Sequence, residues 1–592
     1  MFHKARNTLR TAGLLLALFA LLPLHAAWAD PYRFSGVERV VAVGDVHGAL
    51  EELVIVLRGT GLIDEELNWS GGRTHLVSIG DLLNRGDYGR QVMDLVMRLA
   101  PQAAAAGGAV HVVLGNHESM NLAGDLRYVS EGDYAQFGAG APPGLPPGYH
   151  ERRAAFAPDG EYGRWLLGLP VAIIIDDVLF IHAGLSTRLE GLSLEQINVA
   201  AKRDIRRVAE GWHALRAGGQ FSDTDDFGTV IAEAPQLAQS EDPAVRRIGE
   251  AFTEALDGLP FMPDGPLWYR GSVRCHPFVE TEVAGSILGG LGARTVVVGH
   301  TPTHDRRVTS RLDGRVIGLD TGLNRAVYQG RPAALFIREG ELSAWYDGEG
   351  ELPVEAEPNR IWDRPHGMSD AEIEAFLLAA EVVELEAAGA GGHRRATLEQ
   401  DGRRLTATFN TRDTAPRMRD GRWPRGADRA DRYSHEIAAY RLDRLLGLHM
   451  VPVTVERTIG QERGALRLWI EGSVSEQQRQ AGEARVRSDC PLTTQFKLMN
   501  VFDVLTFNPD HDHGSMRYDP DGQLWLLDQS RAFGTTRDVP GMLRRSGLKI
   551  SPQMAEALAV VTAENAASLM PYLHPRQVEA LVDRAQQLRT QR

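Results

Sequence analysis

The stretch 112–120, "VVLGNHESM", runs from strand-favouring apolar residues directly into a glycine, an asparagine, a histidine and a glutamate. A buried strand that ends by presenting an amide, an imidazole and a carboxylate is either an ordinary polar turn or one loop of a site assembled from several strand ends. In the second case, similar loops should follow other apolar segments of the chain.

Four further segments repeat the pattern: "VERVVAVGDVH" (37–47), "HLVSIGDLLNRGD" (75–87), "DVLFIHAGL" (177–185) and "RTVVVGHTP" (294–302). In four of the five loops glycine directly precedes the polar group, where it permits a sharp turn and a close approach to a ligand. Helical patterns such as "RQVMDLVMRLA" (90–100) separate the early strands. The sequence therefore predicts α/β layering with ligand loops at strand ends.

The polar side chains of these loops form a nitrogen and oxygen ligand set that suits Mn, Fe or Zn and lacks the thiolates of a structural zinc site. We expect Asp45, His47 and Asp81 to hold one ion, and Asp81, Asn116, His182 and His300 to hold the second. Two ions about 3.5–4 Å apart lower the pKa of a bridging water and orient a phosphoryl group.

Two further roles complete this hypothesis. His117 fits a general acid that protonates the leaving oxygen. Arg85 and a later arginine would bind phosphate oxygens bidentately. The alternative is a sheet whose polar turns resemble metal-binding loops but bind no metal. Five such loops in order at strand ends argue against this alternative.

The motifs "GDVHG", "GDLLNRG", "GNHE", "HAGL" and "GHT", in this order, resemble the signature series of the calcineurin-like metallophosphoesterases, in their phosphoprotein phosphatase branch. "MNLAGDLRYV" and "GPLWYRG" are similar to the Shewanella-like phosphatase group within it. The resemblance covers roughly residues 37–350 and implies a β-sandwich flanked by helices. It also implies the six metal ligands above, His117 as proton donor, and Arg85 and Arg270 as phosphate clamps.

Asn84 departs from that pattern, because the family usually has an aspartate there, paired with the histidine that corresponds to His117. A carboxylate would favour the imidazolium, whereas an amide orients the ring but supplies no charge. Metal binding is untouched by this change, so the resemblance implies an active enzyme with a weakened acid.

The N-terminus has the order of a secretory signal peptide: three cationic residues, the apolar run "AGLLLALFALLPL" and a small-residue site at 27–29. We expect residues 1–29 to be cleaved and the protein to be periplasmic or secreted, although an uncleaved anchor is the alternative. The chain has 592 residues and a formal charge of −14. Such an acidic chain is a poor ligand for nucleic acid, and we expect no stable membrane insertion after cleavage.

Length and composition predict more than one domain. We expect a metallophosphatase domain at 30–350 with a helical cap at about 186–265, which includes the helical pattern "SLEQINVAAKRDIRRVAEGWHALR". An acidic, proline-containing linker is expected at 351–370, followed by a second domain at 371–592. The two cysteines, Cys275 and Cys490, are then expected in different domains, with no disulfide framework and no thiolate cluster.

The last third predicts an α+β module. "RRATLEQDGRRLTATFNTRD" (394–413) reads as a hairpin about a "DG" turn, and "SHEIAAYRLDRLLGL" (434–448) as a helix that ends at Gly447. "VPVTVERTIG" and "ALRLWIEGS" are strand-like, and "QFKLMNVFDVLTFN" is helical. "LWLLDQSRAF" then brings Asp528 after another apolar strand.

That order of elements resembles the atypical kinases of the Golgi casein kinase type, over about residues 390–535. The resemblance implies Glu436 as the helix glutamate, Asp510 as the catalytic-loop aspartate and Asp528 as the metal-binding aspartate. Asn410 stands where the strand lysine is expected, and Ser515 where an asparagine ligand is expected. Phosphoryl transfer depends on such groups, so we expect a pseudokinase. The alternatives are an active kinase and an unrelated α+β module. For "DHDHG" itself, the alternative is a surface loop that binds no ligand.

The leading hypothesis is therefore an exported dinuclear-metal phosphatase that hydrolyses phosphomonoesters of phosphoproteins, with phosphotyrosine a plausible substrate and a regulatory C-terminal domain. A second hypothesis is hydrolysis of small phosphoesters or nucleotides. A third, from another class, is a scaffold whose pseudokinase domain binds a protein partner.

Overall fold

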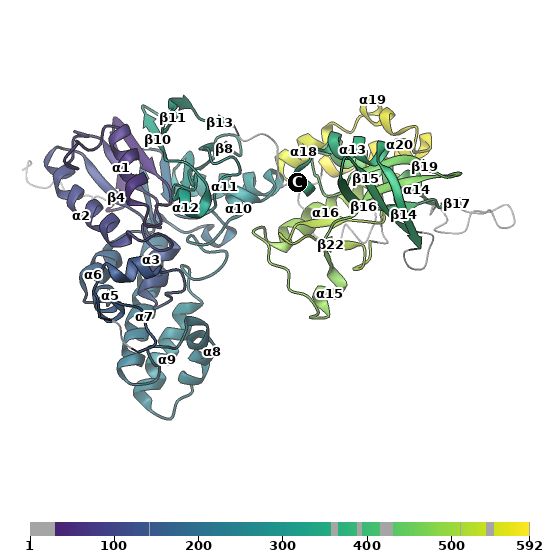
Figure 1. The fold of residues 1–592 in the computed structure, drawn as a ribbon. Helices are drawn as coiled ribbons and strands as arrows, with labels where there is room; N and C mark the ends of the chain where they lie inside the picture. Colours follow the sequence, from purple (N-terminus) through teal and green to yellow (C-terminus); the bar gives the residue numbers. More distant parts are fainter. Residues whose placement is uncertain are drawn as a thin grey trace, which may run out of the picture.

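The computed structural model describes residues 30–140, 143–356, 365–387, 393–414, 430–508, 511–539 and 550–590. It has two parts, each with its own hydrophobic core, and the C-terminal part lies beside the α10–α11 side of the first (Figure 1). The predicted signal peptide lies outside the described residues. None of the helices among those residues has the length and apolar composition needed to cross a membrane.

Two facing β-sheets form the centre of the first part. The seven-stranded sheet runs, in spatial order, β1 Arg33–Phe34, β5 Ala172–Ile175, β6 Val178–Ile181, β7 Thr295–Val298, β9 Val316–Gly318, β8 Thr309–Arg311 and β13 Glu355–Ala356. The six-stranded sheet runs β12 Gly350–Pro353, β11 Glu341–Tyr346, β10 Ala333–Arg338, β2 Arg39–Val43, β3 His75–Ser78 and β4 Ala109–Val112. The predicted linker thus begins inside the sandwich, because residues 351–353 belong to β12 and residues 355–356 to β13.

The sandwich follows from residues that are apolar on both strand faces, as expected where both sides of a sheet are covered. In β2, Val40 and Ala42 point into the core between the sheets, whereas Val41 and Val43 join the core beneath the helices. Strands β2, β3 and β4 are parallel neighbours, and so are β6, β7 and β9. Their carboxyl ends, where the predicted ligands lie, therefore gather at one edge of each sheet.

Helices cover the outer faces of the sandwich and extend it at one end (Figure 1). They are α1 Leu50–Gly59, α2 Gly89–Ala105, α3 Asn116–Leu122, α4 Glu131–Ala135, α5 Tyr149–Phe156, α6 Glu161–Gly168, η1 Thr187–Leu189, α7 Leu194–Ala217, α8 Phe227–Leu237, α9 Pro243–Leu256, α10 Gly271–Arg274, α11 Pro277–Leu291 and α12 Arg325–Tyr328. The helix predicted at 193–216 is confirmed as α7, which the Ser193 hydroxyl caps by accepting from the Gln196 amide. Helices α7, α8 and α9 enclose a small core of their own within the predicted cap.

An antiparallel sheet organises the C-terminal part: β14 Glu381–Ala387, β15 His393–Gln400, β16 Arg403–Asn410, β20 Glu462–Leu468 and β19 Thr454–Ile459. Smaller sheets join β17 Asp413–Thr414 to β18 Asp431–Arg432, and β21 Val474–Ser475 to β22 Met516–Tyr518 and β23 Leu524–Leu526. The helices are η2 Pro365–Gly367, α13 Asp370–Ala379, α14 Tyr433–Leu446, α15 Glu476–Gln480, α16 Leu492–Thr506, α18 Pro552–Ala559, α19 Ala563–Ala566, η3 Ala567–Leu569 and α20 Pro575–Arg589.

The predicted local elements of this part are confirmed. Strands β15 and β16 pair about Asp401 and Gly402, which both have positive φ as a two-residue hairpin turn requires. Helix α14 ends at Gly447 in the left-handed conformation and packs against β19 and β20. The predicted mixed α/β fold with a second α+β part is thus confirmed.

The expectation for the cysteines needs a correction. Cys275, which follows α10, and Cys490, which precedes α16, are bonded to each other with their Cα atoms 5.2 Å apart. A separation of 215 positions gave no signal for this pairing, because only the packing of the two parts brings the residues together. Beside the disulfide, His276 bonds to the Gly447 carbonyl at 3.0 Å, and the Ser551 hydroxyl donates to the Phe278 carbonyl at 2.6 Å.

Candidate metal centre

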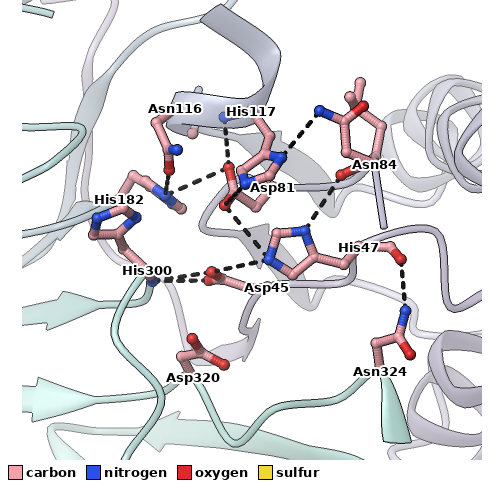
Figure 2. Close-up of polar contacts among 12 residues, drawn as sticks. Asp45, His47, Asp81, Asn84, Asn116, His117, His182, His300, Asp320 and Asn324 are labelled. Atoms are coloured by element: carbon pink, nitrogen blue, oxygen red, sulfur yellow. Dashed lines mark hydrogen bonds and ion pairs between the residues drawn. The ribbon is translucent and has the colours of Figure 1, made fainter. Parts of the chain in front are cut away.

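The predicted ligands converge at the carboxyl edges of the two sheets (Figure 2). Asp45 follows β2, Asp81 follows β3, and Asn116 opens α3 after β4. His182 follows β6 and His300 follows β7, so the second sheet closes the same cluster from the other side. Possible ligand atoms lie within 4.8 Å of one another in two buried groups, His47–Asp81–His117 and Asp81–His182–His300. Asp81 belongs to both.

His47 presents its Nε2 atom to the centre of the cluster. Its Nδ1 lies 3.3 Å from the Leu83 carbonyl, which can only accept, so Nδ1 carries the proton. Nε2 then lies 3.8 Å from Asp45 Oδ2 and 3.6 Å from Asp81 Oδ2. Burial lowers the pKa of His47 to about 3, which keeps the ring neutral. A neutral imidazole fixed in this tautomer is the form that ligates a metal.

His182 shows most clearly that the cluster is built for a cation. Its Nδ1 donates to the Ile79 carbonyl at 2.7 Å, so the lone pair of the neutral ring lies on Nε2. That lone pair faces Asn116 Oδ1 at 2.9 Å and Asp81 Oδ1 at 3.5 Å, which are also electron-pair donors. Burial opposes protonation of His182, but the nearby carboxylates outweigh it and raise the pKa to about 10. Three converging acceptor atoms require a proton or a metal ion between them.

His300 gives an independent sign of the same kind. Its Nε2 atom is buried and has no hydrogen-bond partner among the described residues, which is costly unless a ligand binds there. The His300 amide donates to both Asp45 oxygens, at 3.0 and 3.1 Å. Gly299 permits this approach, because a Cβ at that position would lie 2.3 Å from Asp45 Oδ1.

Glu118, the last residue of the "GNHE" motif, fixes the loops that carry the ligands. Its Oε2 accepts from the amides of Asp81 and Gly115 at 2.8 Å, and its Oε1 accepts from the Leu82 amide at 2.8 Å. Burial and the neighbouring Asp81 raise the pKa of Glu118 to about 7. Sequence reasoning assigned this residue no role, although its place in the motif was a signal.

Strained backbone accompanies these contacts. His47, Asp81, Asn84, Arg85 and His300 all have φ between 48° and 71°, in the left-handed region that costs non-glycine residues energy. The Asp81 carbonyl accepts from the amides of Val46 and His47, which ties the first two loops together. Packing and hydrogen bonds therefore hold a conformation that the isolated loops would not favour.

His117 lies next to the cluster in a network that sets its protonation. The His117 carbonyl can only accept, so the Asn121 group 2.7 Å from it is the amide nitrogen. The same nitrogen donates to Asn84 Oδ1 at 3.1 Å, which leaves the Asn84 nitrogen to donate to His117 Nδ1 at 3.0 Å. The proton of neutral His117 therefore lies on Nε2, 3.9 Å from Asp81 Oδ2. Asn84 thus actively favours the neutral ring, beyond merely lacking a charge.

Two more polar residues of the site were missed from sequence. Asp320 follows β9, is buried beside Asp45, and has a pKa that burial raises to about 6 (Figure 2). Its segment "VIGLD" repeats the pattern of an apolar strand with a polar end, so the signal was present. Asn324 donates to the His47 carbonyl at 2.9 Å and so holds the strained backbone of that ligand.

Arg85 stands at the border of the cluster between two aromatic rings, with its guanidinium carbon 5.0 Å from the Tyr128 ring centre and 5.1 Å from that of Tyr328. Its buried Nε has no hydrogen-bond partner among the described residues. Tyr128 also lies 5.2 Å from the His117 ring. The two tyrosines thus hold the positively charged Arg85 guanidinium at the site, with N–H donors available for an anion.

Comparison with known proteins agrees with this geometry, because a family model for calcineurin-like phosphoesterases matches residues 38–304. Residues 38–304 form a calcineurin-like phosphoesterase domain. Shewanella-like protein phosphatase 1 of Plasmodium berghei is 26% identical over 317 residues, which are 52% of this chain and 73% of that protein. The predicted resemblance to the calcineurin-like phosphoesterases and their Shewanella-like group is confirmed.

Two solved structures are similar to parts of this chain. The cold-active protein-tyrosine phosphatase of a psychrophilic Shewanella species is 26% identical, covers 54% of this chain and 82% of its own, and has a TM-score of 0.40. The Golgi casein kinase structure covers 39% of this chain and 75% of its own, at 12% identity and a TM-score of 0.29.

The residues of the phosphoesterase domain fit a pair of metal ions. Three observations indicate positive charge at two adjacent points. His300 Nε2 has no hydrogen-bond partner among the described residues, acceptor atoms converge at His182 Nε2, and Asp81 belongs to both groups of possible ligand atoms. Asp45, His47 and Asp81 would hold one ion, and Asp81, Asn116, His182 and His300 the other. Bound there, the ions would supply Lewis-acid polarisation of phosphoryl oxygens and a water of lowered pKa.

Arg270, the second predicted phosphate clamp, reaches the same centre from the N-cap of α10. Its Nη1 donates to the His300 carbonyl at 2.8 Å and to the Thr301 hydroxyl at 3.3 Å. The guanidinium is thereby fixed to the backbone of a predicted ligand and stays about a third exposed.

In the C-terminal part, Asp510 lies outside the described residues, whereas Glu436 and Asp528 lie together with His393 in a third group of possible ligand atoms within 4.8 Å. Asn410 donates to Glu436 Oε1 at 2.7 Å, in the place expected for the strand lysine. Arg467, on the neighbouring strand β20, lies 3.1 Å from Glu436 Oε2. Arg467 therefore supplies a positive charge beside Glu436, which sequence reasoning missed. Ser515 donates to the Asp512 carbonyl.

Proposed function

We propose that this chain is an exported phosphomonoesterase with a dinuclear metal centre that acts on phosphoproteins, phosphotyrosine included. The observation that carries the proposal is the convergence of two His/Asp groups that share Asp81, bordered by two arginines. Relatives named as protein phosphatases support the choice of phosphoprotein substrates.

The residues around the metal centre have separate roles in phosphoester hydrolysis. Arg85 and Arg270 bind non-bridging phosphoryl oxygens and orient the phosphorus toward the cluster. In its imidazolium form, His117 donates the Nε2 proton to the leaving oxygen and is left as the neutral ring, which is the step that a poor leaving group needs most. Asn84 and Asn121 hold the ring so that Nε2, and not Nδ1, faces the reacting atoms.

A substrate panel tests the proposal. The full chain, loaded in turn with Mn²⁺, Fe²⁺ or Zn²⁺, is assayed with phosphotyrosine and phosphoserine peptides, nucleoside monophosphates and a dinucleoside polyphosphate. We expect the highest kcat/KM on a phosphopeptide. A kcat/KM at least tenfold higher on nucleotides would instead make the chain a hydrolase of small phosphoesters.

For the C-terminal part we propose a non-catalytic role in binding a protein partner. The amide at Asn410 cannot pair with nucleotide phosphates as a lysine does, and Arg467 already pairs with Glu436. Calorimetry of the full chain with ATP, with and without Mn²⁺, should show weak and metal-dependent binding. Transfer of phosphate from ATP to a protein, abolished by Asp528→Ala, would contradict the proposal.

Export is proposed on the N-terminal sequence, and the disulfide supports it, since disulfides persist in oxidising compartments. Fractionation of cells that express the full chain tests it. The mature protein should be found outside the cytoplasm with a new N-terminus at Asp30.

A further inference from the structure

Helix α10 connects the phosphoesterase site to the C-terminal part through charge. Arg270 caps its beginning and Arg274 ends it. Asp489, more than 200 positions later in the chain, places Oδ1 3.6 Å from Arg270 Nε and Oδ2 3.9 Å from Arg274 Nε. The C-terminal part thus places a carboxylate against a residue that we assign to phosphate binding.

Covalent and polar contacts hold the backbone on both sides of this ion pair. The next residue, Cys490, is bonded to Cys275, which directly follows α10. The Arg311 guanidinium lies behind the helix and donates to the carbonyls of Ser272 and Cys275. An ordinary surface ion pair contributes little because two free side chains must be ordered. Here the backbone next to Asp489 is already held by the disulfide.

The Arg270 guanidinium contacts the metal centre through one of its edges. Its Nη1 bonds to the His300 carbonyl, whereas its Nε faces Asp489. An anion that binds this guanidinium therefore lies close to a carboxylate. The separation of 3.6 Å exceeds a normal hydrogen bond, and the Asp489 side chain is 53% exposed. Asp489 accordingly acts through charge at an open edge of the site and does not fill it.

We propose that Asp489 is a specificity-determining residue of the phosphoesterase site, which favours phosphopeptides with basic residues beside the phosphorylated side chain and disfavours those with acidic ones. The inference rests on the proposed function, because it takes Arg270 as a phosphate ligand. Two unit charges 4 Å apart in water interact by about 1 kcal/mol, which corresponds to about a fivefold change in an equilibrium constant. A substrate charge beside Asp489 should shift KM by that order, with the sign set by the charge.

Two phosphotyrosine peptides that differ only in arginine or glutamate next to the phosphotyrosine test the inference on the metal-loaded full chain. The wild type should prefer the arginine peptide by about fivefold in kcat/KM. Asp489→Asn should reduce this preference to about twofold or less, through KM, and should lower the inhibition constant of inorganic phosphate severalfold. Both effects should shrink as salt is raised.

Glu483→Gln is the matched control, since it removes the same charge from an exposed position of the same segment. It should keep the wild-type preference. Equal preferences in wild type and Asp489→Asn, or an equal change in the control, would overturn the inference. A weaker inhibition by phosphate in Asp489→Asn would also overturn it, because Asp489 would then be positioning Arg270.

The two proposals fail separately. If the chain hydrolyses p-nitrophenyl phosphate but neither peptide, the phosphoprotein proposal fails, and phosphate inhibition of p-nitrophenyl phosphate hydrolysis still decides the role of Asp489. If the chain hydrolyses none of these, calorimetry of phosphate with wild type and Asp489→Asn decides it. The double variant Cys275→Ser/Cys490→Ser should lose preference as Asp489→Asn does, and adding Asp489→Asn should then change little. An unchanged preference in the double variant would overturn the step of the inference in which the disulfide positions Asp489.

Discussion

Replacing Asn84 with aspartate should extend phosphoesterase activity to higher pH. In the wild type, the Asn84 nitrogen donates to His117 Nδ1 at 3.0 Å, and burial lowers the pKa of His117 to about 4. An imidazolium would direct its Nδ1 proton at the donor group of Asn84, and Asn121 prevents that amide from turning over. A carboxylate at position 84 removes this conflict and accepts the proton instead.

The size of the shift follows from the distance. A carboxylate in contact with a histidine raises the histidine pKa by about 1–3 units, which is about 1.4–4 kcal/mol in favour of the imidazolium. The acid form of His117 is lost as pH rises through its pKa, so a higher pKa moves the alkaline limb of activity upward by the same 1–3 units. The Asn121 nitrogen can donate to the new carboxylate as it does to Asn84, so the variant should fold.

The assay is the pH dependence of kcat/KM on phenyl phosphate, which has a poor leaving group, and on p-nitrophenyl phosphate, which has a good one. The shift should be clear on the first and small on the second. Asn84→Ser is the matched control, because it removes the amide without adding charge. An alkaline limb on phenyl phosphate that does not move in Asn84→Asp, with metal content unchanged, would refute the assignment of His117 as the acid.

Three further predictions concern the metal ligands and the disulfide. Asp81→Asn should lower the metal content at both sites, because Asp81 belongs to both ligand groups; near-normal metal analysis and turnover would exclude this site. Asn116→Ala should lower metal occupancy, whereas His117→Ala should keep both metals and lose roughly 100-fold or more in rate; equal metal loss in the two variants would reverse the roles. Cys275→Ser/Cys490→Ser should lower the free energy of unfolding by up to about 5 kcal/mol in the chain-entropy limit for a loop of 215 residues; guanidinium unfolding that matches the wild type would contradict this.

The sequence predicted what depends on local pattern. An apolar strand followed by glycine and a polar group is visible within about ten residues, and so the loops of Asp45, Asp81 and Asn116 could be found before the sheets were known. Asp320 carries the same signal and was overlooked. Glu118 could be noticed because it belongs to the "GNHE" motif. Its role could not be predicted, because two of its three backbone partners lie in another loop.

Features that depend on packing between distant segments could not be predicted. Arg467 reaches Glu436 because β20 pairs with β16, and this strand order has no local signal. The contact of Asp489 with Arg270 likewise requires the two parts of the chain to be docked. The tautomer of His117 depends on its own carbonyl, which orients the Asn121 amide. Asn121 in turn orients the Asn84 amide.

The bond between Cys275 and Cys490 also determines how the two parts can be studied separately. A fragment that ends before residue 365 would leave the thiol of Cys275 without its partner, and would uncover Phe278 and Val279, which pack against the C-terminal core. Such a fragment should form disulfide-linked dimers in air, and its catalytic constants would describe an assembly that the whole protein never forms. Cys275→Ser in the fragment should restore the monomer but not the missing carboxylate at Arg270, so substrate preferences are best measured on the intact chain.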